Sequence, residues 1–71
     1  MQPFTMSIED KEGHSYQHGF HLGSQEALAR SLVQSQFHDR RKARLPTVTI
    51  ALMREGKIID VFYGDKWQSE L

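Results

Sequence analysis

Hydrophobic and polar residues alternate along four short stretches of the chain, which is the pattern of half-buried β-strands. The first stretch, residues 4–9, places Phe4, Met6 and Ile8 on one side of a strand. Residues 15–22 alternate in the same way, and the segment 10–13 between them has the composition of a turn. The first third of the chain is therefore predicted to form a β-hairpin.

A second hairpin is predicted from two β-branched, apolar stretches, residues 47–53 and 57–63, joined by a turn that contains Gly56. Between the hairpins, residues 25–42 contain no Gly or Pro and are predicted to form a helix. Ser24 is expected to cap its start, and Pro46 prevents its continuation. One broad face of this helix gathers residues at helical spacing: Leu28, Ala29, Leu32, Val33, Gln36 and, at its edge, Phe37. Residues 64–71 show neither period and are predicted to form a tail.

The order of the elements, ββαββ, predicts an α+β fold over residues 1–71, which we expect to be a single domain. One helix can cover one face of a four-stranded antiparallel sheet, which makes a two-layer sandwich. A right-handed crossover through the helix favours the strand order 2-1-3-4, and a meander, 1-2-3-4, stays open.

Asp60 decides which side of the last strand is expected to face the helix, because an unpaired carboxylate is costly to bury. The side opposite to Asp60 consists of Ile59, Val61 and Tyr63, which we therefore assign to the core. An apolar patch is then left on the uncovered face of the sheet: Ala51, Met53, Ile58 and Phe62. Exposed apolar patches usually mark interaction surfaces, so a homodimer formed by sheet stacking or edge pairing is predicted.

Trp67, the single tryptophan, lies beyond the last predicted strand. It is predicted to be a lid over the edge of the core, with an exposed anchor for a partner as the alternative, and we include it in the candidate interface. A domain of 71 residues buries only about 60% of the surface of its unfolded chain. Because the chain has no cysteine, no disulfide adds stability, and oligomerisation is the expected source of further buried area.

Charge is balanced overall, with nine Lys and Arg against nine Asp and Glu, which argues against a general nucleic-acid or membrane binder. Locally, however, cations gather at the end of the predicted helix. The structural interpretation is that these cations interact favourably with the negative end of the helix dipole. The alternative is a phosphate-binding or nucleic-acid-binding surface, for which the candidate residues are Arg30, His38, Arg40, Arg41, Lys42 and Arg44.

Three histidines fall within eight positions: His14, His18 and His21. On a regular strand His14 and His18 share a face but lie roughly 13 Å apart, and His21 points the other way. No single metal ion could bridge that span, so no metal site is predicted. A dimer could nevertheless bring the two copies of His18 together.

No catalytic motif is present. The glycines of residues 19–24 match neither a dinucleotide-binding fingerprint nor a P-loop, and the carboxylates Asp10, Glu12, Glu55 and Asp60 have no spacing that requires them to meet. No apolar run approaches the ~20 residues of a membrane span, and no secretory signal is recognisable, so the cytoplasm is expected. The sequence predicts a non-enzymatic module without a cofactor that self-associates, with nucleic-acid or phosphate binding as the alternative function.

Overall fold

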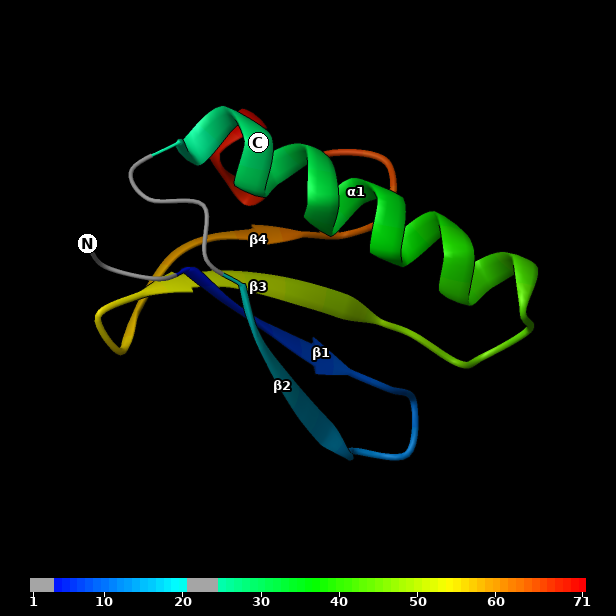
Figure 1. The fold of residues 1–71 in the computed structure, drawn as a ribbon. Helices are drawn as coiled ribbons and strands as arrows, with labels where there is room; N and C mark the ends of the chain where they lie inside the picture. The colour runs from blue at the N-terminus through cyan, green and yellow to red at the C-terminus, as the bar shows by residue number, and fades with distance from the viewer. Residues whose placement is uncertain (1–3, 21–24) are drawn as a thin grey trace.

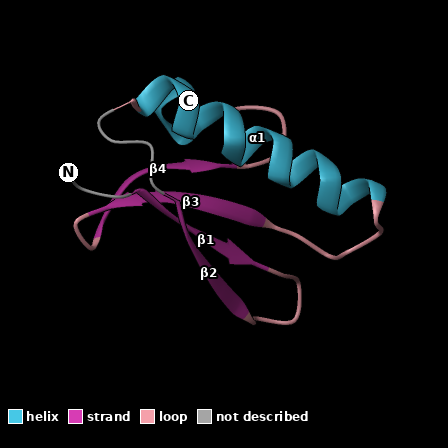
Figure 2. Ribbon diagram, viewed as in Figure 1, coloured by secondary structure: helices cyan, strands magenta, loops and turns pink. Residues whose placement is uncertain are grey.

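A computed structural model describes residues 4–20 and 25–71 of the chain. The four strands form one antiparallel sheet in the order β2-β1-β3-β4, and the helix α1 lies across one face of it (Figures 1 and 2). The predicted α+β architecture and the predicted strand order are confirmed. The elements follow one another as β1 (Phe4–Glu9), β2 (Ser15–Phe20), α1 (Glu26–Lys42), β3 (Thr49–Arg54), β4 (Lys57–Phe62) and a short 3-10 helix, η1 (Gln68–Glu70).

The helix ends in a backbone cap rather than at Pro46 itself. The amide of Leu45 donates to the carbonyl of Arg40, and the amide of Arg44 donates to the carbonyl of Arg41. Arg44 has a φ of 60° in this cap, at the position that glycine usually occupies. The predicted cap at the other end, Ser24, and the predicted extension of the second strand to residue 22 lie outside the described residues.

The core lies between α1 and the covered face of the sheet. Two residues that were predicted on the buried side of the helix, Leu28 and Leu32, are 45% and 39% exposed. The reason is that the buried stripe of α1 is narrow and runs along Ala29, Val33 and Phe37, one residue every turn. The sheet contributes the alternating inner residues of its strands: Phe4, Met6, Ile8, Ile50, Leu52 and Phe62.

A β-bulge determines how β4 faces the rest of the molecule. The turn before β4 is of type I′, in which both central residues have positive φ and the flanking strands pair directly. Met53 accordingly lies opposite Ile58. Its neighbour Leu52, which faces the core, lies opposite Asp60 and not opposite Ile59. Ile59 is thus an extra residue, and every side chain beyond it points to the opposite face from the one that an unbroken hairpin would give.

The bulge makes our assignment of β4 wrong. Asp60 and Phe62 face α1, whereas Ile59, Val61 and Tyr63 were expected to do so. Phe62 is only 6% exposed and lies edge-on to Phe37, with ring centroids 5.5 Å apart.

Trp67 packs against Phe62, with a centroid distance of 5.1 Å, and is itself buried. It is the predicted lid over the core edge. Phe62 and Trp67 are therefore core residues and do not belong to an exposed interface.

Candidate functional site

The face of the sheet that α1 leaves uncovered is apolar along β3 and β4. We call it the outer face and define it by Ala51, Met53, Ile58 and Val61, of which Ala51 pairs with Val61 and Met53 with Ile58. Ile58 is 62% exposed, and Tyr63, which follows by alternation, is 45% exposed. Figure 1 shows α1 and the C-terminal segment on the other side of the sheet. Within the described residues, no element covers the outer face.

Toward β1 the same face becomes polar but stays almost uncharged. Thr5 pairs with Met53 and Ser7 pairs with Ala51, so two hydroxyl side chains adjoin the apolar residues. Among the described strand residues on this face, only Glu9 carries a charge, at the end of β1. Of the five residues predicted as interface, Ala51, Met53 and Ile58 thus lie on one surface.

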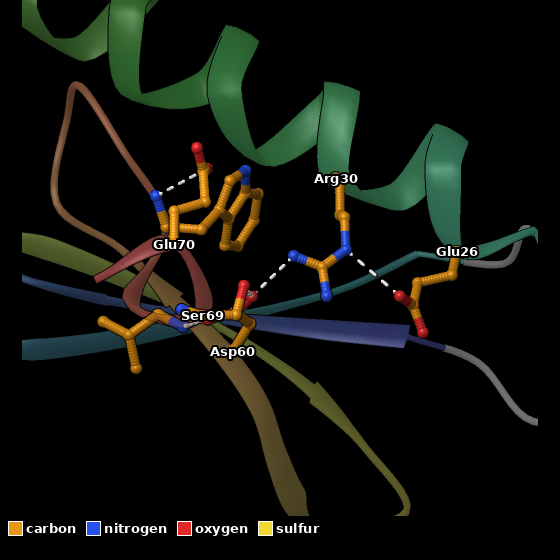
Figure 3. A network of polar contacts seen from close by, with 7 residues as sticks. Glu26, Arg30, Asp60, Ser69 and Glu70 are labelled. Carbon is orange, nitrogen blue, oxygen red and sulfur yellow. Dashed lines mark hydrogen bonds and ion pairs between the residues drawn. The ribbon is translucent and has the colours of Figure 1, made fainter.

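On the covered side, the buried carboxylate of Asp60 joins the end of the chain to the sheet and the helix (Figure 3). Its oxygens accept hydrogen bonds from Arg30 Nη1 at 2.7 Å, from Ser69 Oγ at 2.6 Å and from the backbone amides of Val61 and Ser69 at 2.9 and 3.0 Å. Burial alone would raise the pKa of Asp60, but the Ser69 and Arg30 side chains and the two amides lower this pKa to about 2. The carboxylate is therefore fully satisfied within the fold.

Arg30 was predicted to lie on an exposed stripe that binds phosphate, but its side chain is only 27% exposed and is engaged within the fold. Besides its bond to Asp60, its Nε donates to Glu26 at 3.1 Å, and its guanidinium lies 4.7 Å from the ring centroid of Trp67. Hydrogen bonds to Asp60 and Glu26 raise the pKa of Arg30 further. Arg30 is thus a structural link between α1, β4 and the C-terminal segment.

The remaining basic residues divide into three groups. Arg40 donates from Nε to Thr47 Oγ1 at 2.7 Å and lies 5.7 Å from the Tyr16 ring centroid, so it also serves the fold. His38 and Lys42 are exposed on the helix surface. Arg41 and Arg44 line a hollow that the sequence did not predict.

This hollow, the basic hollow, lies between the end of α1 and the turn that joins β1 to β2. It has a volume of about 410 Å³, and its polar lining consists of Lys11, Arg41, Arg44 and Thr47. Its remaining wall is formed by three apolar residues: Phe37, Leu45 and Pro46. Lys11 is far from the helix in sequence, which is why the sequence pattern did not associate it with the basic cluster.

A second group of polar residues that the sequence did not join lies in the β1–β2 turn. Asp10, Glu12 and His14 each offer one atom that could coordinate a metal ion, and these three atoms lie within 4.8 Å of one another. The turn itself explains this, because Asp10 Oδ1 accepts the amides of Glu12 and His14 and its Oδ2 accepts the hydroxyl of Tyr16. Burial acts to raise the pKa of Asp10, and these bonds lower it. An Asp at the start of a glycine-containing turn is the sequence signal for this arrangement.

The histidines are placed as follows. His14 precedes β2 and lies in the turn, 3.4 Å from Asp10 Oδ2, instead of continuing the strand as predicted. His18 is exposed on β2, and His21 lies outside the described residues.

Two findings concern the chain as a whole. Nowhere in residues 4–20 and 25–71 is there a helix with the length and hydropathy needed to cross a bilayer. Comparison with protein-family models, with curated proteins and with solved structures finds no match.

Proposed function

We propose that this chain is a small, non-enzymatic interaction module that self-associates by stacking its outer face on that of a second copy. The supporting observation is that four apolar side chains, Ala51, Met53, Ile58 and Val61, form one surface that no described element covers. Removing apolar surface from water stabilises an association by roughly 25 cal/mol per Å². A surface of this kind is a common mark of an interaction site.

The composition of the outer face favours a second copy as the partner. In a twofold dimer each residue meets the same surface on the other protomer, so like charges would face each other if the surface carried any. Among the described strand residues on this side of the sheet, Glu9 at the end of β1 is the one charge, so two stacked copies of the outer face would bring no like charges together at its apolar centre. Sheets stack at about 10 Å, a separation that side chains of the size of Ile and Met fill.

The apolar area buried in a dimer would be a large addition for a chain of this size, because the core of one copy is small. The absence of catalytic activity and of a cofactor, and the cytoplasmic location, remain predictions from the sequence.

Light scattering across a dilution series tests the proposal. We expect a dimer that dissociates on dilution, and we expect Ile58→Lys to raise the dissociation constant about tenfold or more, because it buries an unpaired ammonium. Leu28→Lys is the matched control, since Leu28 is a comparably exposed apolar residue on the opposite side of the molecule. A wild-type chain that stays monomeric at roughly 1 mM, or equal effects of the two variants, would contradict the proposal.

Nucleic-acid binding is the alternative function, and the structure leaves it fewer residues than the sequence suggested. Arg30 and Arg40 are engaged within the fold, so the exposed cations no longer form a continuous stripe along α1. Its test is binding to a short single-stranded oligonucleotide, which should weaken steeply with salt and after Arg41→Glu.

A further inference from the structure

The basic hollow brings three cations from two separate segments to one place. Lys11 comes from the β1–β2 turn, Arg41 comes from the last turn of α1, and Arg44 comes from the cap that follows α1. Within the described residues none of the three forms an ion pair, and no carboxylate lines the hollow. Because like charges repel, such a cluster is most stable when an anion lies among them.

The helix dipole explains only part of this cluster. Basic residues in a last turn do interact favourably with the negative end of a helix. Lys11, however, is not part of the helix, and the carbonyls of Arg40 and Arg41 already accept bonds from the amides of Leu45 and Arg44. Screening of the helix end therefore does not account for the convergence of the three side chains.

The backbone of Arg44 is a second, independent observation. Its φ of 60° lies in the left-handed region, which glycine adopts freely and arginine does not. Strained backbone of this kind tends to occur where a side chain has a function. A glycine would adopt this cap with less strain, whereas arginine contributes its side chain to the lining of the hollow.

Contacts within the fold position part of the lining of the hollow. The guanidinium of Arg41 lies 5.3 Å from the ring centroid of Phe37. Gly64 makes room for both, since a Cβ there would lie 2.9 Å from the Phe37 ring and 3.2 Å from Arg41 Nη2. Opposite them, Thr47 is fixed by the hydrogen bond that it accepts from Arg40. Arg41 and Thr47 are thus positioned by contacts within the fold, without a ligand.

We propose that the basic hollow binds the phosphate group of a small organic phosphate. Its volume of about 410 Å³ falls within the usual range of ligand pockets, ~300 to 1,000 Å³. Three cations match a phosphate monoester, which carries a charge of about −1.5 to −2 at neutral pH, and a guanidinium can bind two of its oxygens. Leu45, which is 47% exposed, and Pro46 offer an apolar wall to the organic part.

The shape of the charged surface favours a small ligand over a nucleic acid. Binding along a nucleic-acid backbone needs a groove of charge that follows successive phosphates. Here three cations without an ion pair converge on one hollow, while Arg30 and Arg40, which would extend the surface along α1, are engaged within the fold. The basic hollow lies on the opposite side of the molecule from the outer face, so phosphate binding does not depend on self-association.

Calorimetry and an amide NMR titration of the full chain at low salt test the proposal, with inorganic phosphate, phenyl phosphate and phenol as probes. We expect phenyl phosphate to bind more tightly than inorganic phosphate, and phenol alone not to bind. The largest shifts should fall on the amides of Lys11, Arg44 and Thr47.

Arg44→Gly is the decisive variant, because glycine relieves the backbone strain while the guanidinium is lost. We expect its affinity for phenyl phosphate to fall about tenfold while its melting temperature stays equal or rises. Lys11→Gln should have a similar effect on affinity from an exposed turn position. Lys42→Gln, which removes a charge from the exposed helix surface, should change the affinity less than twofold.

Three results would overturn the proposal. The first is no binding of phenyl phosphate at millimolar concentration. The second is an equal loss of affinity in Lys42→Gln and Arg44→Gly, which would mean that only the overall charge matters. The third is binding of an eight-nucleotide RNA without binding of phenyl phosphate, which would favour the nucleic-acid alternative.

Discussion

The two hairpins show the same alternation of apolar residues, yet of their two edge strands, β2 and β4, only β4 is well covered by other elements. Phe62 on β4 and Tyr16 on β2 both face the side of the sheet that carries α1, but Phe62 is 6% exposed and Tyr16 is 43% exposed. Figure 1 shows α1 crossing the sheet while β2 lies at its far edge. A side chain on the helix side of the sheet is therefore buried only where another element also covers it.

Simple dimensions explain the difference. A helix is about 10 to 12 Å wide, whereas the axes of the outer strands of a four-stranded sheet lie about 14 Å apart and their side chains extend further. One helix cannot cover all four strands. The C-terminal segment fills the gap at β4, where Trp67 packs on Phe62 and Ser69 bonds to Asp60. No described segment does the same at β2.

The largest expected effect comes from truncating the two aromatic residues that define this contrast. Phe62→Ala should lower the free energy of unfolding by about 3 to 5 kcal/mol, because it leaves a cavity among buried side chains. Tyr16→Ala should cost about 1 kcal/mol or less beyond the loss of its bond to Asp10. Urea unfolding of both variants at low protein concentration is the measurement. Equal losses would show that the two edge strands are equally well covered.

An intermediate effect is expected for Asp60→Asn, with a definite dependence on pH. The folded pKa of Asp60, about 2, lies below the ordinary value of 3.8, so the fold stabilises the charged carboxylate. This contribution, about 1 to 2 kcal/mol given that Arg30 is partly exposed, is complete above pH 3.8 and is lost as the pH falls toward 2.

Thermal unfolding between pH 2 and 6 measures the contribution of the charged Asp60 carboxylate to stability. The difference in stability between wild type and Asp60→Asn should be constant at the upper end of this range and should shrink as the pH falls below 3.8. Asp10→Asn is the counterpart in the β1–β2 hairpin, because the pKa of Asp10 is also lowered, and it should leave the Asp60 contribution in place. A difference between wild type and Asp60→Asn that stays constant over this range would contradict the assignment.

The smallest effects distinguish two glycines with positive φ. Gly13 in the β1–β2 turn has a φ of 86° and open space around it, so Gly13→Ala should cost only the backbone term, about 1 kcal/mol. Gly64 has a φ of 106°, and a methyl group there would press on Phe37. Gly64→Ala should therefore cost about 1 kcal/mol more than Gly13→Ala in chemical denaturation. Equal costs would mean that the Phe37 ring moves aside freely.

Much of the fold could be predicted because it depends on local pattern. The period of two along residues 4–9 and the uninterrupted helical stretch gave the elements, and the preference for right-handed crossovers gave the strand order that is observed. The orientation of β4 could not be predicted from alternation alone. Ile59 adds one residue to one strand, and that single residue moves Asp60 and Phe62 to the inner face.

The candidate sites were predictable only in part, for a similar reason. Ala51, Met53 and Ile58 were expected on the uncovered face, and they lie there together with Val61 in place of Phe62. Arg41 and Arg44 were expected in a basic cluster, but their association with Lys11 depends on how the β1–β2 turn packs beside the helix end.

By itself, the sequence determined the number and order of the strands and the place of α1, because turns, helix limits and alternation depend on residues close together in the chain. It did not predict η1 in the segment that was expected to be a tail. Only the tertiary structure decided that Asp60 is buried, since its burial requires Arg30 and Ser69, which are distant in sequence, to supply hydrogen bonds. It likewise decided which cations stay unpaired, because a charge is neutralised by its neighbours in space and not by its neighbours in the chain.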